Sequence, residues 1–329
     1  MSITNVKILT FAFDNAIIKK RGESVENQKK QMSEAAVLYY EKKYTQQEIA
    51  KMMNLSRQTV SKLLTDAEKE NIVEIKINNP DIYCSDLEKS IEELYGINKA
   101  VVCSVSSKEE SVRRIMTVRK ALSYLKPILE KGGQNIGISW GRTIESFVEE
   151  VADIVSSDNT VFPLFGATDQ EESFFLSNEL ARSFADKTGA KVKYAYFPYL
   201  PDSIGDKDLF KNTSYYKKIS ELWKNIDLAI VGIGNKEMTE IFANVFGYSK
   251  ESSNAIGDIS THFFDSEGNF LNLYENTLCA SRDNLKNAKN TVAIACLDSK
   301  VEAIKGALKT GVINTLITDE YTAKKIVMK

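Results

Sequence analysis

One stretch constrains the fold of this chain more than any other: Tyr44–Asn71, with the sequence YTQQEIAKMMNLSRQTVSKLLTDAEKEN. Thr45 and Glu48 form a capping box, in which a threonine at the N-cap and a glutamate three residues later bind the backbone donors that open a helix. The box predicts a helix over Gln46–Met53. Asn54 follows, and asparagine is one of the few residue types that tolerate the left-handed conformation of a tight turn.

A second helix is expected to begin at Arg57, because Ser56 is a favourable N-cap. Its apolar residues recur at the spacing of one helical face: Val60, Leu63, Leu64 and Ala67. Its exposed side carries polar side chains: Arg57, Gln58, Thr59, Ser61 and Lys62. Donors and acceptors at the front of a helix with a buried back suit the major groove of DNA. The pair therefore predicts a DNA-reading helix-turn-helix, with an ordinary helical hairpin as the alternative.

The charge of this region limits how tightly one copy can bind DNA. Residues 33–79 contain seven Lys or Arg and seven Asp or Glu, and the whole chain has a net charge of −2. Most affinity for DNA comes from neutralising phosphates. We therefore expect binding by several copies together, as a homodimer or homotetramer on operator DNA.

Length and composition suggest a two-domain globular protein. The chain has 329 residues, of which 43% are hydrophobic and 27% charged. It contains no apolar run long enough for a membrane span and no secretion signal, so no membrane partner is expected. The four cysteines form no pair motif, which favours reduced thiols and a cytoplasmic location. His262 lies in a hydrophobic stretch, so packing is preferred to metal binding, and no metal or cofactor is expected.

The sequence pattern divides the chain into four parts. Ser33–Lys43 predicts a helix that precedes the helix-turn-helix, with Ala36, Val37 and Tyr40 on one face, and the alternation in IVEIKIN, residues 72–78, predicts a short strand or wing. Ser85 and Glu88 fit a second capping box, which opens a helix to Tyr95. The expected parts are an unassigned arm (1–31), a winged helix-turn-helix domain (32–80), a connector (81–98) and a ligand-binding domain (99–329).

The ligand-binding domain is predicted to be α/β, with a Rossmann-like parallel sheet. Apolar strands separated by amphipathic helices imply such a sheet with both faces covered. The expected strands are Asn135–Ser139, Thr160–Leu164, Val192–Phe197, Leu228–Val231, Val292–Ala295 and Val312–Ile317. The expected helices are Ser111–Glu130, Ile144–Val155, Glu172–Lys187, Ser214–Lys224, Val301–Lys309 and Glu320–Val327. Ligands of such folds bind beyond the carboxyl ends of the strands.

The best candidate for a ligand contact is GISWGRT, where a strand ends in a glycine-containing turn and a helix follows. Backbone N–H groups at a helix N-terminus attract anions. Arg142 and Thr143 would add a charge and a hydroxyl beside Gly141. An ordinary strand–helix turn is the alternative.

Other strand ends can converge on the same place. Gly166 lies in Phe165-Gly166-Ala167, and Asp258 follows Gly257, where it would accept bonds from sugar hydroxyls or cap a turn. Lys300 begins a helix and would neutralise a phosphate or remain solvated. Gly232-Ile233-Gly234 lacks the third glycine of a dinucleotide fingerprint, which excludes a nicotinamide site.

The order of motifs resembles the SorC family of bacterial transcriptional regulators, from about residue 32 to the C-terminus. The matching stretches are AAVLYYEKKYTQQEIAKMMNLSRQTVSKLLTDAEKENIVEIKINNP, GISWGRT, VGIG, AIGDISTHFFDSEGN and KVEAIKGALKTGVINTLITDE. The resemblance implies an effector domain similar in fold to sugar-phosphate isomerases, a phosphorylated sugar as effector, and a dimer or tetramer.

The resemblance also implies roles for individual residues. The family's phosphate-binding loop corresponds to Gly141, Arg142 and Thr143. Its acidic polyol contact corresponds to Asp258, and its basic residue at the start of the late helix to Lys300. The paired glycines that often follow the second strand are matched here by Gly166 alone.

Two functions remain open at this stage. One is a transcriptional regulator of a carbohydrate operon, controlled by a phosphorylated sugar. The other is a sugar-phosphate isomerase-like enzyme with an accessory DNA-binding module. Isomerisation needs a positioned general base, and no second carboxylate or histidine clearly pairs with Asp258. The sequence therefore favours the regulator and predicts no catalytic residue.

Overall fold

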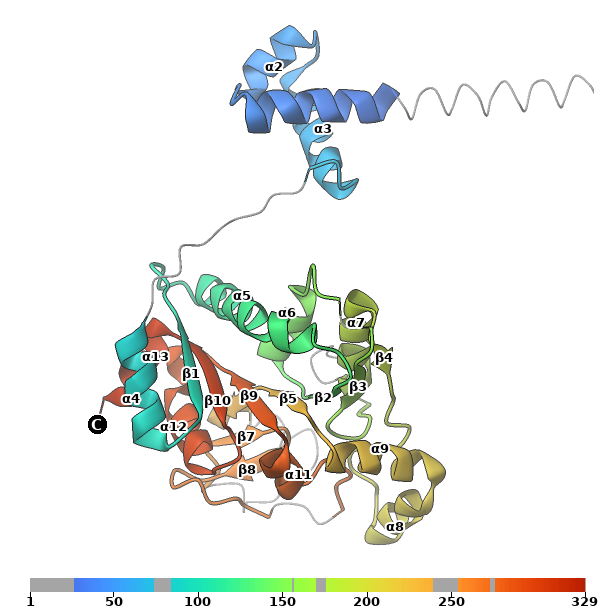
Figure 1. Ribbon diagram of the computed structural model, residues 1–329, viewed down its shortest axis with the longest axis vertical. Helices are drawn as coiled ribbons and strands as arrows, with labels where there is room; N and C mark the ends of the chain where they lie inside the picture. Colours follow the sequence, from blue (N-terminus) through green and yellow to red (C-terminus); the bar gives the residue numbers. More distant parts are fainter. Residues whose placement is uncertain are drawn as a thin grey trace, which may run out of the picture. The chain divides into compact units, whose positions relative to one another are not determined.

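The computed structural model describes residues 27–73, 84–155, 157–169, 176–238, 254–272 and 276–328. The chain divides into two compact units, Met1–Pro80 and Asp81–Lys329, which are described separately (Figure 1). None of the described helices combines the length and apolar character that crossing a bilayer requires.

The smaller unit contains the predicted helix-turn-helix, formed by α2 (Gln46–Met52) and α3 (Arg57–Lys69). The capping box at the start of α2 is confirmed, because Thr45 Oγ1 accepts from the Glu48 N–H and the Glu48 carboxylate accepts from the Thr45 N–H. Asn54 adopts the left-handed conformation, with φ of 55°. Ser56 caps α3 by accepting from the Thr59 N–H at 3.0 Å.

The helix before α2 differs from the prediction. The chain is already helical at residue 27, and a π-helical turn, η1 (Val37–Glu41), follows the α-helical part. Val37, predicted to share one face with Ala36 and Tyr40, is 39% exposed, whereas Ala36, Met32 and Ala35 are buried. A π turn is wider than an α turn, so it changes which residues face inward. Most of the predicted strand over residues 72–78 lies outside the described residues.

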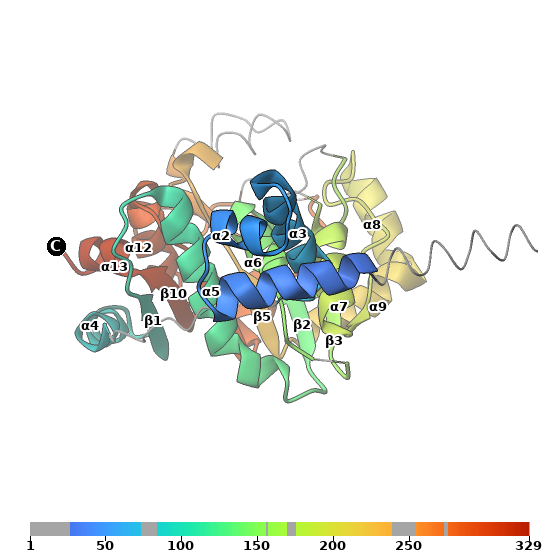
Figure 2. The ribbon, with the colours of Figure 1, turned by 90° about the horizontal axis from the view of Figure 1, so that it is seen from above.

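The larger unit contains a seven-stranded sheet in which every pairing is parallel. Its spatial order is β1-β10-β9-β5-β2-β3-β4, and Figure 2 shows β1, β10, β5, β2 and β3 following one another across the sheet. The strands are β1 (Lys99–Cys103), β2 (Asn135–Ile138), β3 (Thr160–Pro163), β4 (Lys191–Val192), β5 (Leu228–Val231), β9 (Asn290–Ile294) and β10 (Thr315–Asp319). The α/β fold class is confirmed.

Helices cover both faces of this sheet (Figure 1). Leu228 and Ile230 pack on one side and Ala229 and Val231 on the other, as alternation along a strand requires. The first side is covered by α5 (Glu110–Leu129), α6 (Arg142–Glu149) and α7 (Ser177–Thr188). The second is covered by α4 (Ser85–Tyr95), α9 (Ser214–Lys224), α11 (Arg282–Asn287), α12 (Val301–Lys309) and α13 (Glu320–Val327), while α8 (Ile204–Asn212) precedes α9.

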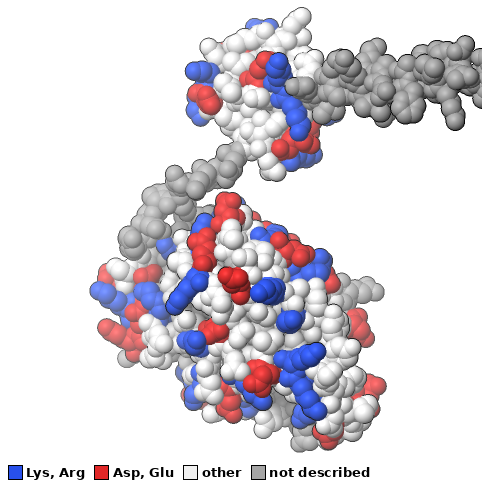
Figure 3. Space-filling view, turned by 45° about the vertical axis from the view of Figure 1, so that its right-hand side comes forward, with Lys and Arg blue, Asp and Glu red and all other residues white. Residues whose placement is uncertain are grey.

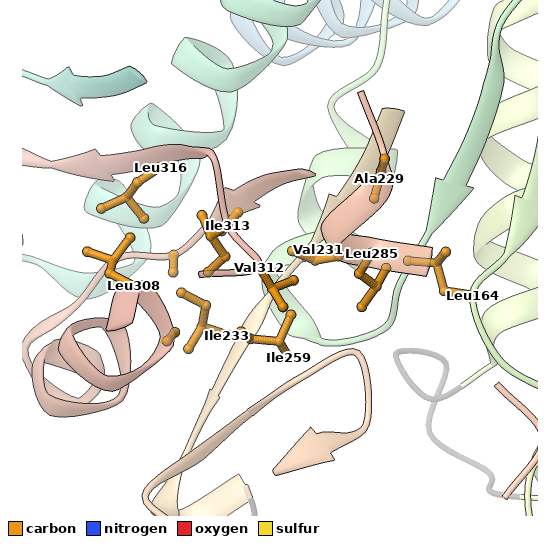
Figure 4. Packing of buried hydrophobic residues seen from close by; sticks show 14 of the residues in the cluster. Leu164, Ala229, Val231, Ile233, Ile259, Leu285, Leu308, Val312, Ile313 and Leu316 are labelled. Atoms are coloured by element: carbon orange, nitrogen blue, oxygen red, sulfur yellow. The ribbon is translucent and has the colours of Figure 1, made fainter. Parts of the chain in front are cut away.

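A second, antiparallel sheet was not predicted. It consists of β6 (Ile233–Asn235), β7 (Gly257–Ile259) and β8 (His262–Phe264). Ile233 and Ile259 pair across β6 and β7. Figure 4 shows these two side chains in the same hydrophobic core as Val231 and Val312 of the larger unit. The small sheet is therefore fixed to the large one by apolar packing.

Several predicted boundaries are wrong by a few residues. Of the strand predicted over Val192–Phe197, only Val192 lies in a strand, β4, and α6 ends at Glu149 rather than Val155. β10 begins at Thr315, three residues later than predicted. The start of the helix predicted over Glu172–Lys187 includes residues outside the described part of the chain.

The helix predicted from Ser85 to Tyr95 is confirmed as α4. It was expected to connect the domains, but it packs in the core of the larger unit through the fully buried Ile91. The predicted capping box is wrong as well, because Cys84 is the N-cap and Ser85 already lies in the helix. Glu88 instead accepts a hydrogen bond from the Val102 N–H at 2.9 Å, and Glu92 accepts from the Ala100 N–H at 2.9 Å. These carboxylates bind the outward-facing donors of β1, an edge strand.

This arrangement predicts that Glu92→Ala lowers the free energy of unfolding by about 1–3 kcal/mol, because the Ala100 N–H loses its acceptor. Glu92→Gln keeps an acceptor at the same place and should lose less. Urea unfolding of the two variants and the parent measures the difference. Equal stability of Glu92→Ala and the parent would contradict the role of α4 as a cover for the sheet edge.

Candidate ligand cavity and DNA-reading face

A cavity of about 160 Å³ lies beyond the carboxyl ends of β2, β5 and β9. From β2 the chain passes to β3 and β4 on one side, and from β5 to β9 and β10 on the other, so this is the point where the strand order reverses. Open α/β sheets bind ligands at such a point. The lining residues include Glu110, Arg114, Trp140, Gly141, Arg142, Thr143, Gly232, Gly234, Asn235, Glu237, Asp258, Ser260, Leu297 and Lys300.

The N-terminus of α6 borders the cavity. Gly141 is its N-cap, with φ of 113°, a backbone conformation that residues with a side chain rarely adopt. No side chain caps the helix. The N–H groups in the first turn of a helix have no acceptor within the helix, and Arg142 and Thr143 of this turn line the cavity. The helix end thus presents positive charge to any anion inside.

Asp258 lies in the wall of the cavity with a side chain that is only 2% exposed. It pairs with Gly234 across β6 and β7, and a Cβ on Gly234 would come within 1.9 Å of Asp258 Oδ1. Asp258 Oδ2 accepts from the Thr261 N–H at 3.2 Å, whereas Oδ1 has no hydrogen-bond partner among the described residues. Burial raises the pKa of this carboxyl to about 6.

Lys300 ends the short helix η4 (Asp298–Lys300) and also lines the cavity. Burial lowers the pKa of its ammonium group, and the nearby Arg114 and Arg142 lower it further, while the charge of Asp258 opposes the change. Lys300 therefore interacts with Asp258 as well as with the two arginines. The lining thus has three cationic residues, Arg114, Arg142 and Lys300, and three acidic ones, of which Asp258 is buried and Glu110 and Glu237 are exposed.

A buried ion pair fixes the wall that carries Lys300. Arg113 is 4% exposed, and its guanidinium donates two hydrogen bonds of 3.1 Å to the Asp319 carboxylate and one of 3.0 Å to Asp298. The Leu297 N–H donates to Thr322 Oγ1 at 2.9 Å, which holds Leu297 at φ of 90°. These bonds join α5, β10, α13 and η4 beside the cavity.

Most residues predicted to bind the effector are brought together here: Gly141, Arg142, Thr143, Asp258 and Lys300. Gly166 is not part of the lining. Its N–H donates to the Leu278 carbonyl at 2.9 Å, and a Cβ at this position would come within 2.6 Å of the Pro198 backbone. Gly166 therefore permits a close approach of two chain segments. Contact of each residue with an effector remains a prediction.

The structure adds residues that sequence patterns did not predict, above all Glu110, Arg114, Trp140 and Ser260. Glu110 and Arg114 start the helix after β1, so the rule that ligands bind at strand ends could have found them. Trp140 lies inside the GISWGRT motif but reads as a core aromatic. Ser260 follows a strand of only three residues, which gives no periodic signal.

The described residues contain no group of three or more His, Cys, Asp or Glu that could hold a metal ion. The partly buried His262 forms a hydrogen bond of 2.8 Å with the Ala280 carbonyl.

The candidate DNA-reading face lies on α3. Its four buried residues form the unit's core with α2, and the side chains predicted to read DNA are all exposed: Arg57, Gln58, Thr59, Ser61 and Lys62. The Thr59 hydroxyl lies 2.8 Å from Ser56 Oγ, so it takes part in the cap. Acidic and basic side chains intermingle on the visible surface of this unit (Figure 3). Whether each residue contacts DNA remains a prediction.

The burial of Asp258 predicts a dependence of stability on pH. The pKa of Asp258 rises from 3.8 to about 6 on folding. The free energy of unfolding therefore falls by roughly 3 kcal/mol as the pH increases through this range. Asp258→Asn should remove this loss, so its stability relative to the parent should be greater at pH 7 than at pH 4. Urea unfolding at the two pH values measures the change.

Asp265→Asn is the matched control. Hydrogen bonds from Asn269 lower the pKa of Asp265, so its carboxylate adds stability at high pH and its variant should change in the opposite direction. A relative stability of Asp258→Asn that does not depend on pH would contradict the assignment.

Each of the two units matches a known protein family. The family model "Putative sugar-binding domain" matches residues 80–328, and the model "Sigma-70, region 4" matches residues 32–69. The Sorbitol operon regulator of Klebsiella pneumoniae is 30% identical over 88% of this chain and 95% of its own length. The Deoxyribonucleoside regulator of Bacillus subtilis is 28% identical over 92% and 99%.

A solved structure shares this fold. The crystal structure of the full-length sorbitol operon regulator SorC from Klebsiella pneumoniae matches with a TM-score of 0.71 and 30% identity, and the match covers 90% of this chain and 98% of that one. The relatives are regulators of transcription and not enzymes. The chain belongs to the SorC family of sugar-binding transcriptional regulators.

Proposed function

We propose that this regulator binds the operator of a carbohydrate operon and that a phosphorylated sugar in the cavity controls its affinity for DNA. One observation carries the proposal: the same cavity contains the N-terminus of α6, three cationic side chains and the buried carboxylate of Asp258. The first two suit a phosphate. A carboxylate with an oxygen that lacks a partner suits the hydroxyl groups of a sugar.

The opposite charges of these groups orient the ligand. A phosphate beside the Asp258 carboxylate would be repelled, so we place the phosphate at Gly141, Arg142 and Thr143. Asp258 then holds hydroxyl groups at the other end of the ligand. Lys300 is attracted by the charge of Asp258 and repelled by that of Arg142, so we assign its ammonium group to neutralise part of the charge of the carboxylate and of a bound phosphate. The names of two relatives, regulators of a sorbitol operon and of deoxyribonucleosides, are consistent with a ligand of this class.

The DNA partner is assigned to α3, and the protein is proposed to act as a homodimer or homotetramer. Both Arg57 and Lys62 are exposed on this helix, but residues 33–79, which include it, contain as many acidic as basic residues. A single unit therefore gains little from phosphate neutralisation. Two or more copies on repeated half-sites would supply the missing affinity.

The ligand assignment is tested by isothermal titration calorimetry with the monophosphates of sorbitol, erythritol and deoxyribose, each beside its unphosphorylated form. Erythritol is included because a further relative, 27% identical, is the erythritol catabolism regulatory protein EryD of Brucella abortus. The parent should bind at least one monophosphate in preference to the free compound. Thr143→Ala and Lys300→Ala should lower the affinity for the phosphorylated ligand by tenfold or more, and each factor of ten corresponds to about 1.4 kcal/mol of binding free energy. Asp258→Ala should weaken both forms.

Glu302→Ala serves as the control for Lys300→Ala. Glu302 lies two residues after Lys300, in α12, but is not among the residues that line the cavity. Fluorescence gives a second readout, since Trp140 lines the cavity and Trp223 is buried in the core with its indole N–H donating to Pro163. Equal affinity for a monophosphate and its free form in the parent would rule out the phosphate site.

The DNA assignment is tested by substitutions on α3. Arg57→Ala and Gln58→Ala should each cost about 1–3 kcal/mol of specific operator binding for a lost bidentate base contact, and leave ligand binding unchanged. Fluorescence anisotropy with labelled operator DNA measures the affinity. Lys69→Ala, at the far end of α3, is the control. Parent-like operator affinity in both variants would show that another surface reads the DNA.

A further inference from the structure

The tip of the hairpin between β7 and β8 has an unusual backbone. Ile259 pairs with His262, which leaves Ser260 and Thr261 as a two-residue turn. Both have positive φ, 46° at Ser260 and 75° at Thr261. Turns with two positive φ angles normally use Asn-Gly or similar pairs, and a β-branched threonine in this region is an outlier. The turn therefore contains backbone strain.

The packing of Ile259 determines the direction of the neighbouring Asp258 side chain. This residue is fully buried in the core beside Ile233 (Figure 4). Neighbouring residues along a strand point to opposite faces. Asp258, the neighbour of Ile259 in β7, accordingly lies on the cavity side, and Ser260, the first residue of the turn, also lines the cavity.

Both side chains end in a buried oxygen that lacks a partner. Ser260 and Asp258 are each 2% exposed, and neither Ser260 Oγ nor Asp258 Oδ1 has a hydrogen-bond partner within the described part of the chain. A buried polar atom without a partner is costly. Two such atoms in the wall of one cavity indicate groups that a ligand completes.

We propose that Ser260 is a ligand-contacting residue, and that its hydroxyl and Asp258 Oδ1 together bind hydroxyl groups at the end of the effector remote from the phosphate. The ionised Asp258 only accepts hydrogen bonds, whereas Ser260 both donates and accepts. The pair therefore suits a polyol segment, whose hydroxyls also do both. Strain in the turn is retained because it directs the Ser260 hydroxyl into the cavity. The inference rests on the proposed function.

The test compares Ser260→Gly and Ser260→Ala with the parent, in the full chain. Both should bind the tightest of the three monophosphates at least tenfold more weakly, while inorganic phosphate, which has no polyol segment, should bind all three proteins alike. Without ligand, Ser260→Gly should unfold at or above the Tm of the parent, because glycine tolerates positive φ and a buried hydroxyl without a partner has been removed.

Ser260→Ala separates the effect of the hydroxyl from that of the strain. Alanine lacks the hydroxyl but keeps the Cβ atom, which is strained at positive φ, so the Tm of this variant should lie below that of Ser260→Gly by about 2–4 °C. Asp153→Gly is the matched control, since Asp153 is exposed, has φ of 54° and is not among the lining residues. It should retain the ligand affinity of the parent.

Parent-like affinity in Ser260→Gly would overturn the inference and leave the proposed function intact. A Tm well below the parent in Ser260→Gly would also overturn it, because the serine would then act in folding. Failure of the parent to bind any of the monophosphates would contradict the proposed function and the inference together.

Discussion

The parallel direction of the seven strands is the constraint on which the rest of the larger unit depends. Both faces of a parallel sheet must be covered, so strand residues such as Ile138, Ile230 and Ile294 are apolar and pack against the covering helices. Polar groups are left to the segments that leave the carboxyl ends of the strands. Since β2, β5 and β9 end on the same edge, the loops after them meet in one cavity although they are far apart in sequence.

Rigid packing around this cavity leaves some of its polar groups unsatisfied. Arg113 and Asp319 form a buried ion pair with several hydrogen bonds, and the N–H of Leu297, which has a positive φ, donates to Thr322 and Asp319. Gly234 leaves space for the Asp258 carboxylate. A stable surrounding structure can maintain a buried carboxylate and hydroxyl without partners, at a cost in stability. Under the proposed function, these groups are in place before a ligand binds.

Much of this could be predicted from sequence because local signals were strong. The capping box at Thr45, the turn at Asn54 and the cap at Ser56 are short-range features, and the structure has all three. The alternation of apolar strands with amphipathic helices also predicted the correct fold class. Strand ends and glycine turns pointed to Gly141 and to Asp258, which line the same cavity.

The remaining features depend on tertiary contacts that leave no periodic pattern. The strands β6 to β8 have three residues each, too few for alternation to be recognised, and the turn at Ser260 lacks the glycine or asparagine that marks a hairpin. Glu88 resembled a capping residue but binds a strand brought close by folding. Gly166 matched a ligand position by sequence, whereas the structure explains it by the approach of Pro198.

The central claim is that the cavity and the DNA-reading face act in one regulator. The most direct measurement is the affinity for operator DNA, by fluorescence anisotropy, with and without a saturating sugar phosphate. Coupling of two sites typically changes affinity by about 5- to 150-fold, and the DNA must change the affinity for the sugar phosphate by the same factor. We predict such a reciprocal change. Operator affinity that is unaffected by a sugar phosphate bound in the cavity would contradict the account.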